Sequence, residues 1–154
     1  MTPLTTPSLA QLINRAARAL ARDADTALKP LGLRYAQVPV IALLNEGVGL
    51  TQKELAEATG IEQPSMAQLL ARMDRDELIR RTPNPRDARS QTIELAPAAE
   101  ARMSDAHDRL ADLDARAVAG FTAAEVSTLK LLLTRLGDNL DRRRDGSEVV
   151  DPPS

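Results

Sequence analysis

The chain has 154 residues, a net charge of −2 and no cysteine. This length is enough for one domain with a substantial core, and the helix-rich pattern with little strand indicates a mostly α fold. The absence of cysteine excludes disulfides, thiol-based redox sensing and cysteine-ligated zinc. The longest apolar run, residues 38–44, is far too short to cross a bilayer, and the N-terminus lacks the basic and apolar segments of a signal peptide. We therefore expect a cytoplasmic protein without a membrane partner.

The N-terminal part of the chain is predicted to be helical. Residues 1–7 contain three threonines and two prolines and are expected to be flexible. Ser8 can cap a helix in which apolar residues recur at helical spacing until Pro30 ends it. A second helix is expected over residues 35–45, with Pro39 in or near its first turns.

The middle of the chain has the pattern of a helix-turn-helix. Thr51 is followed three residues later by Glu54, a capping box that predicts a helix over about 52–59. Gly60 stands where a helix end needs a residue that tolerates positive φ. The apolar pattern resumes at once with Ile61, so the turn before the next helix is short.

The second helix of this motif has Pro64 in its first turn. Four apolar residues at helical spacing predict its buried stripe: Met66, Leu69, Leu70 and Met73. The opposite face carries small, amide and basic residues: Pro64, Gln68, Ala71 and Arg75, with Gln63 and Ser65 beside its N-terminal end. Such a face suits insertion into a DNA major groove, although an ordinary solvated helix fits this pattern equally well.

A hairpin follows the second helix and favours DNA binding. Residues 78–83 and 91–95 are short enough to be strands. The segment between them has the proline, asparagine and aspartate of a turn, with Arg86 and Arg89 projecting from the tip. A β wing directly after a helix-turn-helix is the winged-helix arrangement.

The pattern of the C-terminal part predicts two more helices. The first should run from Pro97 to about Ala117, and Gly120 then interrupts the apolar pattern. Its apolar residues recur like those of a coiled coil: Ala99, Met103, Ala106, Leu110, Leu113 and Ala117. The final helix begins at the capping box of Thr122 and Glu125, and its stripe has the same spacing: Val126, Leu129, Leu133, Leu136 and Leu140. These narrow seams predict pairing with a second protomer, with an intramolecular bundle as the alternative.

Three short motifs occur in order along the chain. The first is a Gly-Leu pair followed by a glutamine and two aliphatic residues: Gly32, Leu33, Gln37, Val40 and Ile41. The second is Leu-Thr-Gln-x-Glu-Leu-Ala at residues 50–56, and the third is a wing signature made by Pro85, Asp87 and Arg89. Together they resemble the multiple-antibiotic-resistance regulator (MarR) family of winged helix-turn-helix transcription factors, and the resemblance covers most of the chain.

The resemblance implies a mostly α (α+β) fold, in which a two-stranded wing completes a winged helix-turn-helix. The expected organisation is a single domain over 1–154, with a DNA-binding core at 31–96, dimerisation helices at 8–30 and 97–144, and flexible termini at 1–7 and 145–154. Departures from the family pattern occur at Glu77, Asn84, Arg34 and Ala96. Because the family usually has glycine at the first of these, Glu77 is expected at positive φ. None of the four is expected to face the DNA groove.

The implied function is that of a homodimeric repressor, which places one recognition helix per protomer in successive major grooves of a pseudo-palindromic double-stranded operator. Four residues are expected to read bases: Gln63, Pro64, Ser65 and Gln68. Three are expected to position the preceding helix on phosphates: Thr51, Gln52 and Lys53. The resemblance implies that Arg89 enters the minor groove and that Asp87 braces it. Arg72, Arg75 and Arg86 complete the expected DNA-binding set.

The charge around these residues is only slightly basic. Residues 62–91 contain six arginines and five acidic residues, which gives a net charge of +1, and the rest of the chain carries −3. DNA binding should therefore depend on a dimer that presents two such surfaces. The rival interpretation is a helical-dimer adaptor that has kept the fold and lost DNA binding.

Catalytic, metal and cofactor sites are not expected. The chain has one histidine, no cysteine and no glycine-rich phosphate loop, so neither a His-based triad nor a zinc site can be assembled. Family members often bind small anionic aromatic or phenolic effectors between the dimer helices and the winged helix. The nearest candidates here are Arg15, Arg18, Tyr35, Gln37 and His107. Equally, Arg15 and Arg18 simply cover the first helix, and His107 is structural.

Overall fold

The computed structural model describes residues 6–144, so the predicted flexibility of the termini lies almost wholly outside the described residues. Helices make up most of the described chain, together with one small sheet. In chain order the elements are α1 (Leu9–Leu28), the 3-10 helices η1 (Lys29–Leu31) and η2 (Tyr35–Gln37), α2 (Val38–Leu44), β1 (Leu50–Thr51), α3 (Gln52–Thr59), α4 (Gln63–Arg75), β2 (Ile79–Asn84), β3 (Asp87–Leu95), α5 (Pro97–Glu100), α6 (Met103–Ala117) and α7 (Ala123–Arg144).

The chain divides into two compact units, with the boundary after Asp114 near the end of α6. The first unit contains every element from α1 to β3, α5 and most of α6. The second contains the last residues of α6 and the whole of α7. The expectation of a single domain over the whole chain stays a prediction.

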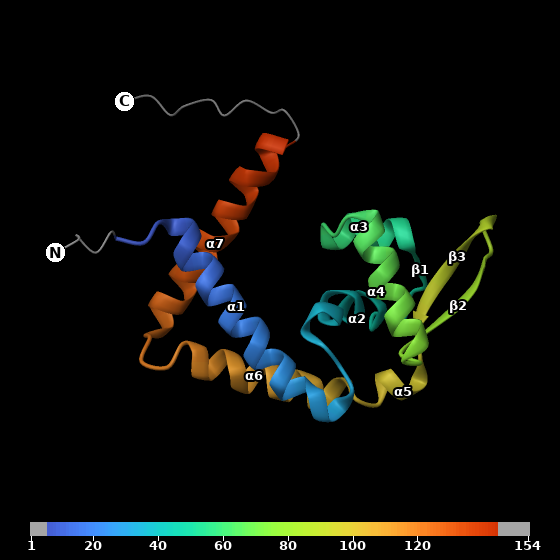
Figure 1. The fold of residues 1–154 in the computed structure, drawn as a ribbon, viewed down its shortest axis with the longest axis horizontal. Helices are drawn as coiled ribbons and strands as arrows, with labels where there is room; N and C mark the ends of the chain where they lie inside the picture. Colours follow the sequence, from blue (N-terminus) through green and yellow to red (C-terminus); the bar gives the residue numbers. More distant parts are fainter. Residues whose placement is uncertain (1–5, 145–154) are drawn as a thin grey trace. The chain divides into compact units, whose positions relative to one another are not determined.

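Within the first unit, α2, α3, α4 and the strands form a winged helix-turn-helix, from which the β2–β3 hairpin projects as the wing (Figure 1). The sheet is antiparallel with β3 in the centre, in the order β1–β3–β2. In β1, Leu50 pairs with Ile93 and Thr51 pairs with Thr92. The sequence predicted two strands, and β1 is a third. A strand of two residues has no alternating pattern from which it can be predicted.

The start of α3 is closed by the predicted capping box. The hydroxyl of Thr51 accepts from the backbone N–H of Glu54 at 3.2 Å, and the carboxylate of Glu54 accepts from the N–H of Thr51 at 2.8 Å. Gly60, at φ 71°, ends the helix, and α4 begins after Glu62 with Pro64 in its first turn. The predicted helix-turn-helix is therefore confirmed with its boundaries.

The core of the winged helix is formed by apolar side chains of α3, α4 and the sheet that are at most 1% exposed: Leu55, Met66, Leu70, Met73 and Ile93. Three of the four residues predicted for the buried stripe of α4 belong to it, and the fourth, Leu69, is partly buried against it. Burial of this stripe fixes which face of α4 remains in solvent.

The end of α4 confirms the expectation for Glu77. This residue has φ 59°, the only positive φ of a non-glycine residue in the described chain. The N–H of Glu77 donates to the carbonyl of Asp74 at 3.0 Å, and the N–H of Leu78 donates to that of Met73 at 2.9 Å. This pair of hydrogen bonds is the Schellman closure, in which one residue at positive φ reverses the chain.

Two predicted helices are divided in the structure. The helix expected over 35–45 begins as the 3-10 turn η2 and becomes α-helical only at Val38. Pro39 has no N–H, so it can stand only in the first turn of an α-helix and cannot continue one from Tyr35. The prediction of one continuous helix here is wrong in its start.

The helix expected from Pro97 to Ala117 is likewise two helices, α5 and α6. The N–H of Arg102 bonds to the carbonyl of Ala99 at 3.0 Å, three residues back, which tightens the chain between them. The Arg102 guanidinium donates to the carbonyl of Leu31 at 3.0 Å. A contact over such a distance in sequence is not visible in the local apolar pattern, which continues across the break.

The second unit is dominated by α7. Gly120 has φ 84°, and the predicted capping box follows it, with the N–H of Thr122 donating to Glu125 at 2.8 Å and the N–H of Glu125 donating to the Thr122 hydroxyl at 3.1 Å.

Within residues 6–144, no helix combines the length and the apolar character that crossing a bilayer requires.

Candidate nucleic-acid interface

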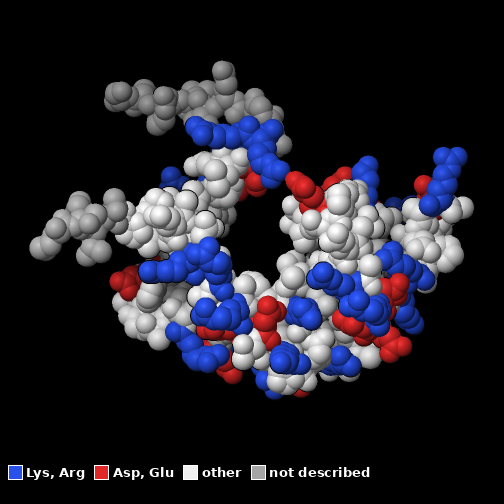
Figure 2. All heavy atoms as spheres, in the orientation of Figure 1, with Lys and Arg blue, Asp and Glu red and all other residues white. Residues whose placement is uncertain are grey.

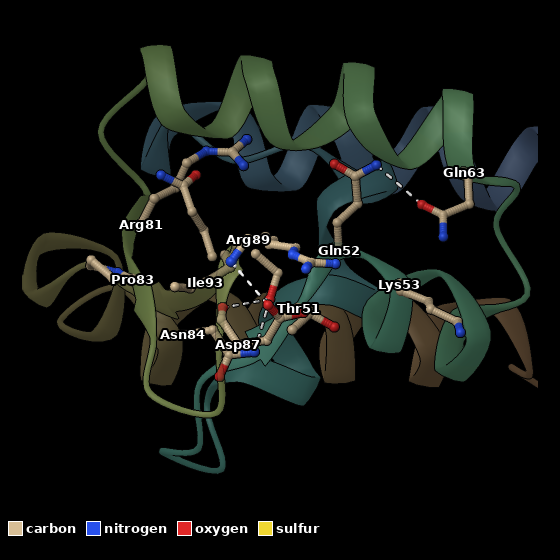
Figure 3. A pocket seen from close by; sticks show the side chains of 13 residues that line it. Thr51, Gln52, Lys53, Gln63, Arg81, Pro83, Asn84, Asp87, Arg89 and Ile93 are labelled. Atoms are coloured by element: carbon tan, nitrogen blue, oxygen red, sulfur yellow. Dashed lines mark hydrogen bonds between the residues drawn. The ribbon is translucent and has the colours of Figure 1, made fainter.

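An open groove of about 810 Å³ lies between the N-terminal ends of α3 and α4 and the wing (Figure 3). Its lining includes six residues expected to contact DNA: Thr51, Gln52, Lys53, Gln63, Asp87 and Arg89. These residues come from three segments that the β1–β3 pairing and the helix-turn-helix bring together. The structure therefore places the two helix starts and the wing around one site.

The start of α3 offers this groove hydrogen-bond donors and positive charge. The first N–H groups of a helix have no partner within the helix and attract anions such as phosphates. Lys53 lies in this first turn, and its only ion pair in the described chain is an exposed one with Glu57 at 4.0 Å. An exposed pair of this length holds the ammonium weakly, so Lys53 remains free to meet a phosphate.

The carboxylate of Glu54 is part of the same helix start. The backbone N–H of Thr51 donates to it and holds the pKa of Glu54 below its ordinary value of 4.5, with smaller contributions from the Thr51 hydroxyl and from the charge of Arg86. Glu54 is therefore ionised at neutral pH and fixes the geometry of the residues that face the groove.

The recognition helix α4 exposes every side chain that the sequence assigned to DNA contact: Gln63, Pro64, Ser65, Gln68, Arg72 and Arg75. Met66, Leu70 and Met73 are fully buried on the other side. Arg75 makes an exposed ion pair with its neighbour Asp76 at 3.7 Å. The helix thus has one face committed to the core and one free polar face.

Two glutamines connect the starts of the two helices. The side-chain amide nitrogen Nε2 of Gln52 donates to the carbonyl oxygen Oε1 of Gln63 at 3.1 Å (Figure 3). From the sequence we expected Gln52 to contact phosphate and Gln63 to read bases, and no pattern in it indicates that the two side chains meet. Each is the first residue of its helix, and no local pattern relates positions eleven apart across a turn.

The tip of the wing is shaped by two side chains that accept hydrogen bonds from the backbone. The Oδ1 of Asn84 accepts from the N–H of Arg86 at 3.0 Å, and the Oδ1 of Asp87 accepts from the N–H of Arg89 at 2.9 Å. The amide of Asn84 also donates to the hydroxyl of Ser90 across the hairpin at 2.9 Å. The Asp87 side chain therefore supports Arg89 by accepting from the backbone N–H of Arg89. No ion pair joins the two side chains in the described chain.

The groove also contains residues that sequence reasoning missed. Asn84 lines it, although it was not among the residues expected to contact DNA. Arg81 of β2 lines it too, and its Nε lies 3.4 Å from the carboxylate of Asp74 on α4. Asp74 and Arg81 thereby link the wing to the recognition helix. The only signal for Arg81 in the sequence is its place in a predicted strand, and that does not reveal its partner.

Basic side chains project at the wing tip, where the sequence places Arg86 and Arg89, and are mixed with acidic ones elsewhere on the winged helix (Figure 2). This distribution agrees with the small positive surplus calculated for the segment. The groove therefore attracts a polyanion through a few well-placed cations and helix N-termini, and not through a broad basic surface.

The model of the MarR family matches residues 31–90, the segment that builds this groove. HTH-type transcriptional repressors of Mycobacterium bovis and of Mycobacterium tuberculosis are each 26% identical to the chain over 131 residues, which are 85% of this chain and 94% of the relative. The chain is therefore similar to the MarR family over residues 31–90. Its winged helix and flanking helices are also similar to those of solved MarR-family proteins.

Among solved structures, the chain is similar to a mutant of MarR from E. coli complexed with operator DNA, with a TM-score of 0.77 and 26% identity over 83% of this chain and 92% of that one. It is also similar to the transcriptional repressor CouR bound to a 23-mer DNA duplex, with a TM-score of 0.77 and 25% identity over 84% and 92%. The family and these relatives are transcriptional regulators and not enzymes.

The five candidates for an effector pocket have different environments in this structure. Gln37 is 2% exposed, and its Oε1 accepts from the N–H of Arg34 at 3.0 Å. The guanidinium of Arg34 has no acceptor, so only this half of a capping box is formed. Arg15, Arg18 and His107 are exposed on their helices, and Tyr35 is 41% exposed.

Proposed function

We propose that this protein is a homodimeric repressor that binds a pseudo-palindromic operator in double-stranded DNA. The observation that carries the proposal is the groove in which the starts of α3 and α4 meet the wing. A helix with one buried and one free polar face suits the major groove, and a hairpin beside it with an arginine at its tip suits the adjacent minor groove. The relatives named as repressors and the DNA-bound neighbours support this function.

The contacts divide by role. Thr51, Gln52 and Lys53 lie at the start of α3, where phosphates are held and orientation is set. Gln63, Pro64, Ser65 and Gln68 lie on the exposed side of α4 and read bases, while Arg72 and Arg75 extend this face. Arg89 enters the minor groove, with Asp87 holding its backbone and Arg86 adding charge at the tip.

Dimerisation is proposed from apolar side chains at both ends of the chain. In the first unit, Leu9 and Leu12 of α1 are 63% and 42% exposed. In the second unit, α7 has no buried residue, and five of its six leucines are between 41% and 59% exposed: Leu129, Leu131, Leu132, Leu133 and Leu140. Apolar surface of this extent is stabilised by a partner, and a second copy is the partner that an operator with two half-sites requires.

We also propose that a small anionic or phenolic effector releases the operator. A cleft of about 890 Å³ in the first unit carries four basic and two acidic side chains: Arg22, Lys29, Arg34, Arg102, Asp25 and Asp76. Asp76 is the C-cap of the recognition helix, so an anion in this cleft would act on the end of α4. Release requires that the effector bind the free dimer more tightly than the DNA-bound one.

A gel shift with the DNA upstream of the protein's own gene tests the proposal. We expect the protein to shift this DNA, and a matched duplex of shuffled sequence should not compete with it for binding. If the folded dimer shifts neither duplex, the proposed function is wrong and the alternative of a helical-dimer adaptor is favoured.

A further inference from the structure

We propose that Gln52 sets the base preference of Gln63. By holding the carbonyl of the Gln63 amide, Gln52 leaves the amide nitrogen to meet the DNA, so each recognition helix selects a base with a keto group, guanine or thymine, at the position that Gln63 reads. This inference rests on the proposed function and adds to it the kind of base that one side chain recognises.

The geometry that carries the inference is the 3.1 Å hydrogen bond from Nε2 of Gln52 to Oε1 of Gln63. In Figure 3 the carbonyl oxygen of Gln63 faces Gln52, and its amide nitrogen points away. Within residues 6–144 this nitrogen has no hydrogen-bond acceptor, and Gln63 is exposed. The side chain therefore presents two free N–H groups to a ligand of the groove.

A free glutamine does not have such a preference. Its amide carries a donor on one arm and an acceptor on the other, and rotation of the amide exchanges them. Held by Gln52, the amide of Gln63 offers its donor arm. In the major groove guanine O6 and thymine O4 are acceptors, whereas the amino groups of adenine and cytosine are donors at the corresponding place. A fixed donor that is directed at this place, and not at the N7 acceptor of a purine, therefore distinguishes keto from amino bases.

The contact is not needed to hold the helix-turn-helix together. An exposed hydrogen bond between two side chains contributes little to folding stability. The two helices are joined by fully buried residues instead, among them Leu55 on α3 and Leu70 on α4. Substitution of Gln52 should therefore leave the fold intact, so that a change in base preference can be assigned to what Gln63 presents.

The test measures binding of the full-length protein to a library of duplexes randomised at one half-site, with selected sequences read by sequencing. The variant Gln63→Ala first identifies the position that Gln63 reads, as the one at which selection is lost. At that position we expect the parent to favour guanine or thymine by about five- to tenfold.

Three variants at the start of α3 then test the role of Gln52. In Gln52→Glu the carboxylate accepts from the Gln63 amide nitrogen and turns its carbonyl outward, so preference should change to adenine or cytosine. Gln52→Met removes the hydrogen bond at similar length, so the preference should disappear. Lys53→Gln makes the same change in charge as Gln52→Glu at the neighbouring residue, and should weaken binding while leaving the base preference unchanged.

The outcomes separate this inference from the proposed function. If the parent selects an operator but Gln52→Glu and Gln52→Met keep the parent's preference at that position, or if Gln63→Ala loses no selection, the inference is overturned and the function stands. If the parent selects no sequence, both are overturned. Unchanged circular dichroism and melting of each variant will show that a change in preference does not come from unfolding.

Discussion

Glu77 shows how one residue can carry a local cost that the rest of the helix end tolerates. A residue with a Cβ at φ 59° is strained by about 1 kcal/mol relative to glycine, yet the two Schellman hydrogen bonds at Asp74 and Met73 require this conformation. The departure from the family's usual glycine predicted this strain from the sequence. The prediction was possible because a helix end that reverses the chain has few backbone solutions.

Glu77→Gly should raise the free energy of unfolding by roughly 0.5–1 kcal/mol, because glycine adopts positive φ without a steric penalty. Urea denaturation at constant m-value measures the change. Glu77→Ala is the matched control, since it removes the carboxylate and keeps the Cβ, and it should give no such gain. An equal rise in both variants would assign the effect to charge and not to the backbone.

Glu54 predicts a dependence of stability on pH. The pKa of Glu54 is lower in the folded protein than its ordinary value of 4.5. The ionised carboxylate therefore makes its full contribution to stability above the ordinary pKa. This contribution is lost as the pH falls through the lower pKa of the folded state. In Glu54→Gln this titration is absent. Its unfolding free energy should therefore decline less steeply than the parent's between about pH 5 and the acid limit of folding. Parallel declines in urea denaturation would contradict this role.

The sequence predicted the helix starts and turns whose signals lie within a few neighbouring residues. Capping boxes predicted the starts of α3 and α7, and Gly60 predicted the turn between α3 and α4. The division of α5 from α6 was missed, because it depends on a contact between Arg102 and Leu31 that lie far apart in sequence. The strand β1 was missed for the related reason that its existence depends on pairing with β3.

The recognition helix gives a prediction that belongs to it alone. Gln68 is exposed on the face of α4 opposite its buried stripe, where we propose that it reaches a base edge. Gln68→Ala should weaken operator binding by about 1–3 kcal/mol per half-site and leave the dependence on salt nearly unchanged. Binding to random duplex DNA is the control and should not change. An equal loss on both DNAs, seen by fluorescence anisotropy, would show that Gln68 does not read sequence.

At the scale of the whole molecule, the candidate site is assembled from segments that the sequence predicted separately. The two helix starts and the wing tip were each assigned to DNA, but their convergence on one groove required the pairing of β1 with β3. Arg81 and Asn84 were missed because their role follows from that convergence. Most of the predicted seam from Ala99 to Leu113 is buried or partly buried within the first unit, as the intramolecular alternative expected. Five of the six leucines of α7 remain exposed, and the dimer that they imply stays a prediction.

The proposed dimer makes the state of association sensitive to α7. Leu133 lies on the apolar stripe of this helix and is 47% exposed, whereas Ser127 is exposed on the opposite side. Leu133→Glu would bury a charge in the dimer and should shift the parent's dimer towards monomer or unfolded chain. Ser127→Glu adds the same charge and should leave the dimer intact. A parent protein that sediments as a stable folded monomer at micromolar concentration would refute the dimer.

The salt dependence of DNA binding by Arg89→Ala will show whether the wing and the recognition helix hold DNA together. The positive charge of Arg89 should be attracted to the negative potential of the minor groove. Removing this charge should therefore weaken binding to operator and random DNA alike. We expect the slope of log affinity against log salt to fall by about one charge per protomer or less. If Arg89→Ala binds the operator as tightly as the parent, with the same slope, the wing does not engage DNA and the proposed mechanism is wrong.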